Sequence, residues 1–450
     1  MSNNNSNQGG SLGLGTCVAM IAGGMIGSSI FSLSGLTMTS AGPSAILTWA
    51  IAAVIMLCYG LICAELSTRF PKSGGVFVFP SKALGKTEKE GALWGWISTW
   101  GYINANIVAI AFAAIYVGTY LSVGFPIFAN MQIPLALIAV AFITILNCVN
   151  FALAGKVNNL LVLALVITMV AYIAISFGSG EWDTSLLTPF FTQGSAGSTG
   201  FLAMVPTAMT GYGSIVAMAF MVSEVKNPNR NVPRSVLIAM ILVLCLYLGM
   251  ILATVGLISA DFLMENPGMQ FIPMFAAAFT KLAAIPWVSK LISISALLAL
   301  LTTMMTVTSL TSRAIQAAAE KGSLPKKLSE TNKSGVPSYA TFVVMIPAAI
   351  ISCFPQFTST IVSFGALFAT VTITINIISL LKARSKFDLP EGAFHAPGGN
   401  VLPIFALLLI VICYIPDIIG GGWMIWAYSI AWYIIGIIYY KIRMKNQSAE

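Results

Sequence analysis

Long apolar blocks alternate along the chain with short polar connections. Four clear examples, each with few or no charges, are Ile46–Cys63, Ile133–Asn147, Leu160–Phe177 and Val236–Ile258. A helix needs roughly 20 such residues to cross a membrane, because every backbone N–H and C=O must find its partner inside the segment. We therefore predict an all-α membrane protein with twelve transmembrane helices. Their expected ranges are Leu14–Leu36, Pro43–Leu66, Leu93–Val123, Ile133–Phe151, Val157–Phe177, Gly200–Val222, Pro233–Ile258, Val288–Ala318, Tyr339–Phe354, Thr360–Leu381, Val401–Ile418 and Trp423–Arg443.

Basic residues gather on one side of this predicted arrangement. Of the 22 Lys and Arg, all but Lys281 and Lys290 fall in the connections that follow even-numbered spans or at the C-terminal end. The acids on the opposite side are Glu181, Asp183, Asp261, Glu265 and Asp417. Cytoplasmic loops of membrane proteins are enriched in Lys and Arg, so we predict that both termini face the cytoplasm.

Composition agrees with a membrane protein and excludes several other classes. Hydrophobic residues make up 58% of the chain and charged residues 8%, with a mean hydropathy of +0.90; soluble domains are about a quarter charged. The net charge of +8 follows from the loops that face lipid headgroups, so we expect no nucleic-acid partner. The seven cysteines lie scattered in apolar segments, which indicates neither disulfides nor a metal site. The polar start, Met1–Ser11, does not resemble a signal peptide.

Two of the predicted spans contain glycine-rich polar interruptions. The first span carries Gly23–Phe31, with three glycines and two serines, and the sixth carries Thr210–Ser214. A small-residue packing surface is one interpretation of the first run. The sixth-span interruption favours the other, because paired breaks at matching positions of two repeats are typical of a transporter's binding site. We therefore predict that the first and sixth helices are broken and that their free backbone groups bind a substrate.

Four motifs follow one another along the chain, the first inside the first span and the others after the second, sixth and eighth spans. Gly27–Phe31 is similar to Gly-Ser-Gly-Ile-Phe, with Ser29 in place of the second glycine, and Ala64–Gly75 is similar to Ala-Glu-Leu…Pro-Lys-Ser-Gly-Gly. Glu224–Arg234 nearly matches a further segment, and Ala319–Pro325 is similar to Ala-Arg-Asp-Gly-Leu-Leu-Pro. In these motifs the chain resembles the amino acid–polyamine–organocation (APC) family of secondary transporters, of the bacterial amino acid permease or antiporter type.

The resemblance implies a core of five plus five helices in inverted repeats, with two peripheral helices outside it. The corresponding segments are a cytoplasmic tail at 1–11, a first repeat at 12–178, a second repeat at 199–383, the last two spans at 400–443 and a tail at 444–450. A bacterial inner (plasma) membrane is the expected location. The last two spans offer either a homodimer face or a lipid-facing surface.

The resemblance also implies that the α-amino and α-carboxyl groups of a substrate bind the backbone at the breaks. The matching positions are Ile26, Gly27, Ser28 and Ser29 at the first break, and Thr210, Tyr212, Gly213 and Ser214 at the second, with Tyr212 as an aromatic gate. In the third span, Asn106 matches a substrate-contacting asparagine of some family members, and Asn104 lies nearby. An interhelical hydrogen bond is the alternative role for both asparagines.

Three departures from the family pattern concern substrate and coupling. Leu165 stands where some proton-coupled members have a lysine, and Val216 where some exchangers of cationic substrates have a glutamate. Val307 stands where an aromatic residue stacks on arginine-type substrates. We therefore expect a small or neutral amino acid, exchanged for another amino acid or amine. A proton-coupled symporter and a polyamine or basic amino acid antiporter remain the alternatives.

A few further residues are candidates for gating or coupling. Glu65 and Glu224 lie at span ends, where they serve either as gate or proton sites or as partners of basic loop residues. His395 falls in a polar loop, and the Thr302–Ser309 patch favours sodium only weakly. A membrane-embedded enzyme would need intramembrane acid or histidine clusters, and a nutrient sensor a soluble output domain. We expect neither, and no cofactor or metal.

Overall fold

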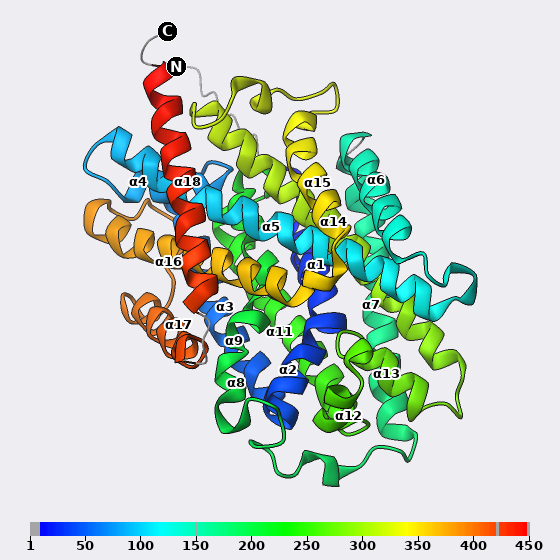
Figure 1. The fold of residues 1–450 in the computed structure, drawn as a ribbon. Coiled ribbons are helices and arrows are strands. Elements are labelled where there is room, and N and C mark those ends of the chain that lie inside the picture. The colour runs from blue at the N-terminus through cyan, green and yellow to red at the C-terminus, as the bar shows by residue number, and fades with distance from the viewer. Residues whose placement is uncertain (1–9, 150, 420–422, 448–450) are drawn as a thin grey trace.

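The protein is built from helices along nearly the whole chain (Figure 1). The computed structural model describes residues 10–149, 151–419 and 423–447, so the tails expected at 1–11 and 444–450 lie partly outside the described residues. Within these ranges the extended pairing is a single isolated parallel bridge between Leu12 and Val225. The predicted all-α class is confirmed.

The helices follow the apolar blocks of the sequence. The main helices are α1 (Leu14–Met25), α2 (Ser34–Ala41), α3 (Ala45–Arg69), α4 (Gly75–Ala83), α5 (Glu88–Gly124), α6 (Gln132–Val149), α7 (Phe151–Gly178), α11 (Pro228–Val255), α14 (Trp287–Glu320), α15 (Ser338–Ser352), α16 (Thr358–Lys386), α17 (Val401–Ile419) and α18 (Trp423–Gln447). Short helices are α8 (Gly200–Ala203), α9 (Val205–Thr210), α10 (Ala217–Phe220), α12 (Ala260–Glu265) and α13 (Pro273–Thr280).

Several of these helices are long and apolar enough to cross a membrane. Among the described residues seven stretches meet that test by length and composition, or eight if a bent pair is one span. The first stretch, Leu14–Arg69, covers two of the predicted spans. Three shorter apolar helices, Gln132–Cys148, Ser338–Ser352 and Val401–Pro416, fall on three others. A multi-helix membrane protein is thereby confirmed, while the count of twelve and the inverted repeat stay predictions.

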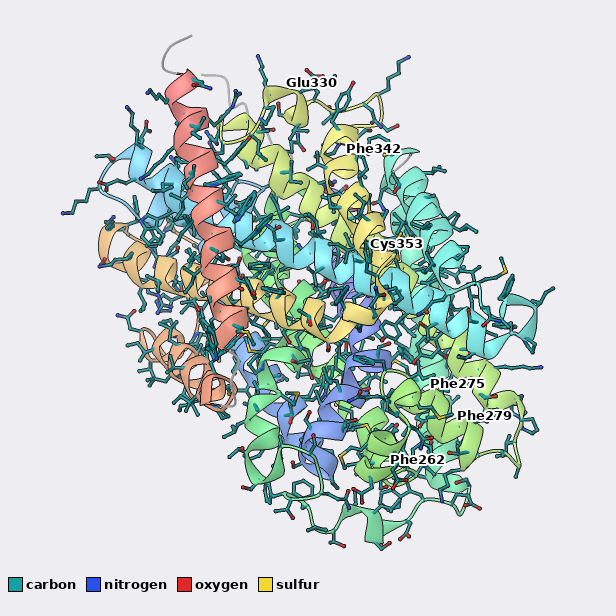
Figure 2. The ribbon with its side chains drawn as sticks, in the orientation of Figure 1. Phe262, Phe275, Phe279, Glu330, Phe342 and Cys353 are labelled. Carbon is teal, nitrogen blue, oxygen red and sulfur yellow. The ribbon has the colours of Figure 1, made fainter. Side chains whose placement is uncertain are left out.

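Large apolar side chains cover the outer surface of the bundle. Phe279 on α13 and Phe342 on α15, both labelled in Figure 2, are 57% and 46% exposed. Along α17 and α18, Val401, Leu408 and Tyr428 are exposed as well. A soluble monomer rarely exposes so much contiguous apolar surface. These side chains suit contact with lipid tails.

Both predicted interruptions appear as breaks in the helices. α1 ends at Met25, and Ile26 has an extended backbone with ψ 94° before a π-helical turn, η1 (Ser29–Leu33), leads into α2. In the sixth span, the segments Gly197–Thr210 and Gly213–Phe220 meet at an angle of 47°. Helix ends leave backbone N–H and C=O groups without intrahelical partners. The breaks thus place backbone groups without intrahelical partners inside the bundle.

The last helix is attached to α5 by hydrogen bonds from two indoles. The ring N–H of Trp96 donates to the carbonyl oxygen of Gly436 at 2.8 Å, and that of Trp100 donates to Trp432 at 3.2 Å. Gly436 allows this approach, because a Cβ there would lie 2.7 Å from the Trp100 ring nitrogen. α17 and α18 lie at one edge of the molecule (Figure 1).

Candidate functional site

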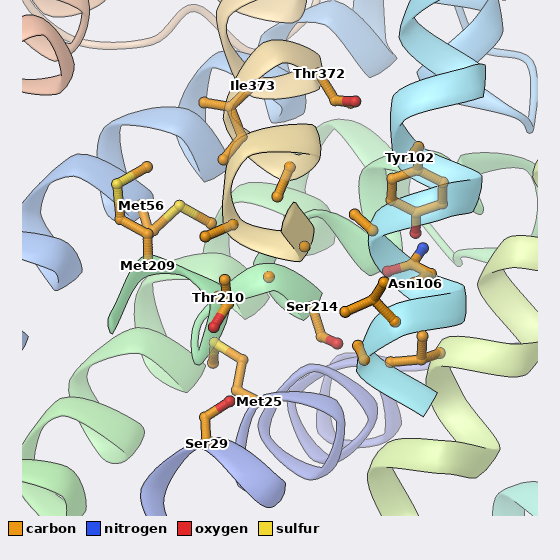
Figure 3. A pocket seen from close by; sticks show the side chains of 18 of the residues that line it. Met25, Ser29, Met56, Tyr102, Asn106, Met209, Thr210, Ser214, Thr372 and Ile373 are labelled. Carbon is orange, nitrogen blue, oxygen red and sulfur yellow. The ribbon is translucent and has the colours of Figure 1, made fainter. Parts of the chain in front are cut away.

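A cavity lies in the middle of the bundle, between the two breaks and the helices α3, α5, α14 and α16. Its volume is about 120 Å³, measured as the space that the centre of a water molecule can reach. One water needs about 10–15 Å³ on this measure, so the cavity has room for a small molecule. Figure 3 shows Met25 and Ser29 on one side, Thr210 and Ser214 beside them, and Tyr102 and Asn106 on α5.

Most of the residues predicted to bind a substrate line this cavity. They are Ser28, Ser29, Asn106, Thr210, Gly213, Ser214 and Val307. Ile26, Gly27, Asn104 and Tyr212 are not part of the lining. The side-chain amide of Asn104 instead donates to the carbonyl oxygen of Trp100, one turn earlier in α5, at 2.7 Å. The bond of Asn104 thus stays within its own helix, while Asn106 points towards the cavity beside Tyr102 (Figure 3).

The first break is packed against α14. A Cβ on Gly27 would lie 1.6 Å from Oγ1 of Thr303, so no larger residue fits unless Thr303 moves. Gly24 approaches the second break in the same way, because a Cβ on Gly24 would lie 2.5 Å from Oγ of Ser214. Thr303 lines the cavity, and its buried Oγ1 has no hydrogen-bond partner among the described residues. Glycines at the first break thus allow the second break and α14 to approach it.

Aromatic rings lie behind the second break. Tyr212 is fully buried, and its hydroxyl donates to the carbonyl oxygen of Trp49 at 3.2 Å. Its ring packs against Tyr247 of α11 at a centroid distance of 5.2 Å. Sequence reasoning missed Trp49 and Tyr247, because an aromatic residue in an apolar span looks like ordinary core packing. Tyr212 stays a predicted gate, although in this structure its side chain lies beside the cavity and not in it.

The lining of the cavity is uncharged, and apolar side chains form the larger part of it. Met56 on α3, Phe112 on α5 and Ile373 on α16 contribute apolar surface, together with Val216 and Val307. Among the residues that line the cavity, no side chain is an acid, a lysine, an arginine or a histidine. An ionic group of a ligand would therefore be held by hydroxyls and by backbone dipoles at the helix ends. This arrangement suits a small zwitterion with an apolar side chain.

Comparison with known proteins agrees with this geometry. The family model described as amino acid permease matches residues 12–439, which is almost the whole chain. The chain belongs to the amino acid permease family, within the APC group of transporters. The members of this family transport their substrates across membranes and are not enzymes.

The permease is similar to several curated bacterial proteins. It is 25% identical to the branched-chain amino acid permease BcaP of Bacillus subtilis, over 95% of this chain and 91% of the relative. Identity to BcaP of Lactococcus lactis is also 25%, over 94% and 92% of the two chains. The serine/threonine exchanger SteT of Bacillus subtilis is 26% identical over 56% of each chain.

Both acids that were candidate gate residues lie in ion pairs of the permease. Glu65, at the end of α3, pairs with Arg69 of the next turn and with Arg384 of α16. Glu224, after the sixth span, pairs with Arg313 of α14. Burial raises the pKa of the Glu224 carboxyl above its ordinary value of 4.5, although Arg313 acts in the opposite direction. These pairs agree with the structural alternative, and a gating role stays a prediction.

The remaining candidates lie at the edges of the site or outside it. Leu165 is fully buried, so an apolar side chain occupies the position of the lysine found in some relatives of the family. His395 lies in the loop between α16 and α17. Among the described residues, no group of three or more His, Cys, Asp and Glu could hold a metal ion.

Proposed function

We propose that this permease carries a neutral amino acid with an apolar side chain, of the leucine, isoleucine and valine class, across the membrane by alternating access. The central cavity is the proposed binding site. The substrate's α-amino and α-carboxyl groups contact the backbone of the two breaks at Ile26–Ser29 and Thr210–Ser214. Its side chain lies against Met56, Val307 and Ile373.

The observation that carries this proposal is the composition of the cavity lining, which combines helix termini and uncharged polar groups with apolar side chains. At the two breaks, helix termini and the hydroxyls of serines and a threonine suit the charged groups common to all amino acids. No lining residue carries a charged side chain, so a cationic side chain of a substrate would lose its hydration without a carboxylate to compensate. The BcaP relatives, named as branched-chain amino acid permeases, support the same substrate class.

Exchange of one amino acid for another is the proposed mode of transport. Leu165 cannot carry a proton, and the SteT relative is named as an exchanger. We further propose that Tyr212 and the Glu65 and Glu224 ion pairs take part in opening and closing the path. Proton-coupled symport, and exchange of polyamines or basic amino acids, are outcomes that the experiment below separates.

The proposed topology has twelve crossings, with repeats at 12–178 and 199–383 and both termini in the cytoplasm of a bacterial cell. Counting Leu14–Arg69 as two crossings, and adding the bent pair and the three shorter helices, supports this number. A cysteine placed at Glu181 should react with an impermeant thiol reagent in intact cells. A cysteine at Lys333 should react only after permeabilisation. The exposed apolar face of α17 and α18 leaves a homodimer as a further proposal.

The decisive experiment is uptake of radiolabelled amino acids into proteoliposomes that contain the purified permease. Leucine, isoleucine, valine, alanine, serine, threonine, arginine and putrescine are each tested in empty vesicles, in preloaded vesicles and under an imposed proton gradient. Uptake of the branched-chain group after preloading is the expected result. Uptake of leucine in empty vesicles under a proton gradient would replace exchange by symport. A preference for arginine or putrescine would contradict the proposed substrate class.

A further inference from the structure

One tyrosine outside the cavity contacts both helix breaks. Tyr247 lies in α11 and is fully buried. Its hydroxyl donates to the carbonyl oxygen of Met25 and also lies 3.2 Å from the carbonyl oxygen of Gly211. Met25 is the last residue of α1, and Gly211 is the C-terminal cap of α9. A single side chain of α11 therefore reaches the backbone where each of the two breaks begins.

This hydroxyl has one proton for two acceptors. A phenol donates a single hydrogen, so the two carbonyls either share it or accept it in turn. The last carbonyls of a helix lack partners inside that helix, and leaving a buried carbonyl unsatisfied is unfavourable. Moving the breaks apart would deprive one of the carbonyls of this donor. Tyr247 thus favours conformations in which the carbonyl oxygens of both breaks stay within hydrogen-bonding distance of its hydroxyl.

The ring that carries the hydroxyl is fixed by its neighbours. Its centroid lies 5.1 Å from that of Trp49, with the planes at 87°, and 5.2 Å from that of Tyr212. Trp49 belongs to α3, and its indole N–H donates to Thr37 of α2 at 3.0 Å. A Cβ on Gly211 would lie 2.7 Å from the Trp49 ring, so the backbone of the second break is in close contact with these aromatic rings. The hydroxyl therefore has a position set by several spans and cannot simply follow one break.

Tyr247 acts from behind the wall of the cavity. Met25, Thr210 and Gly213 line the cavity, whereas Tyr247 is not one of its lining residues. We propose that Tyr247 is a positioning residue whose hydroxyl sets the spacing between the two breaks, and with it the spacing of the backbone groups that bind the substrate. This role rests on the proposed function, because those backbone groups are the ones assigned to the α-amino and α-carboxyl ends. Since every amino acid has these ends, the contribution of Tyr247 is independent of the substrate side chain.

The test compares Tyr247→Phe with Tyr172→Phe. Tyr172 of α7 is an equally buried tyrosine whose hydroxyl bonds to Thr254 at 3.0 Å, so the control loses the same atom away from the breaks. Dissociation constants for leucine, valine and alanine are measured on the purified proteins, together with their melting temperatures. Tyr247→Phe should weaken binding about tenfold for all three amino acids, the effect of one hydrogen bond. Tyr172→Phe should leave the affinities unchanged. An unaltered affinity in Tyr247→Phe, or a loss confined to one amino acid, would overturn the proposal.

A second measurement needs no substrate. Gly213 faces open space, with no atom within 4 Å of the position that a Cβ would take, so Gly213→Cys places a thiol at the second break without a clash. Its alkylation is followed by mass spectrometry of the peptide, with Tyr247 or Phe at position 247. Without the hydroxyl of Tyr247, the second break should move more freely, and the cysteine should be alkylated several-fold faster in the phenylalanine variant. Equal alkylation rates in the two proteins would refute the positioning role. If the unmodified permease binds no amino acid, the proposed function fails, while this measurement still decides the role of Tyr247.

Discussion

Glu65 and Arg384 are far apart in the chain but in direct contact in the fold. The Nε atom of Arg384 on α16 donates to Oε1 of Glu65 on α3 at 3.0 Å. Glu65 is fully buried, and its carboxylate also accepts from Arg69 at 2.9 Å and from the backbone N–H of Ala396 at 2.9 Å. One carboxylate therefore holds together α3, α16 and the loop before α17.

Replacing this acid should destabilise the permease strongly. Glu65→Gln leaves the buried guanidinium groups of Arg69 and Arg384 without their carboxylate, and breaking a buried pair costs about 3–5 kcal/mol. We expect a large fall in the melting temperature of the purified protein in detergent. Glu391→Gln, an exposed acid in the loop after α16, is the matched control and should melt like the parent. A melting temperature of Glu65→Gln equal to that of the control would show that the pair is dispensable.

Glu224→Gln should change the stability of the permease much less than Glu65→Gln, and by an amount that depends on pH. Burial raises the pKa of Glu224 despite Arg313, so ionising this carboxyl is less favourable in the folded state than in the unfolded chain. For an acid with a raised folded pKa, the stabilisation is fully present below the ordinary value of 4.5 and is lost as pH rises through the folded pKa. At pH 7.5 the variant should differ by at most about 1 kcal/mol. On acidification towards that ordinary value, the parent should gain thermal stability relative to Glu224→Gln. A difference that stays constant with pH would contradict this assignment.

Adding one methyl group at the first break should impair binding. A Cβ on Gly27 meets Oγ1 of Thr303 at 1.6 Å, and such overpacking costs about 1–3 kcal/mol when neighbours must shift. Gly27→Ala should therefore reduce leucine affinity and lower the melting temperature. Gly13→Ala, where a Cβ meets nothing within 4 Å, should leave both unchanged. Full activity of Gly27→Ala would mean that the approach of α14 to this break is not required.

A carboxylate beside the second break should change substrate preference. Val216 lines the cavity, and a negative charge about 4 Å from a cationic side chain is worth up to about 4 kcal/mol at an effective dielectric constant of 20. Val216→Glu should shift the ratio of arginine to leucine binding at least tenfold towards arginine, as measured by competition. Val216→Gln has nearly the same size without the charge and should not produce this shift. An unchanged ratio in Val216→Glu would place the substrate side chain elsewhere.

The sequence by itself determined the class of the fold and the main elements of the site. Uninterrupted apolar blocks leave no way to satisfy backbone hydrogen bonds in a membrane except as helices, so their positions are readable without the structure. The glycine and serine runs at Gly23–Phe31 and Thr210–Ser214 likewise marked the breaks, because such residues weaken a helix locally. The acids Glu65 and Glu224 stood out because a charge at the end of an apolar span needs a partner.

The tertiary structure decided which of these residues face one another. Asn104 and Asn106 are two positions apart, and the rotation of α5 alone directs Asn106 to the cavity and Asn104 to its own helix. Arg384 as the partner of Glu65, Thr303 as the neighbour of Gly27, and Tyr247 as the donor to both breaks are contacts between distant segments. Local patterns do not encode these contacts, because a buried threonine or tyrosine in an apolar span has the same local signature wherever it packs. Only the packing of α11, α14 and α16 around the two breaks determines them.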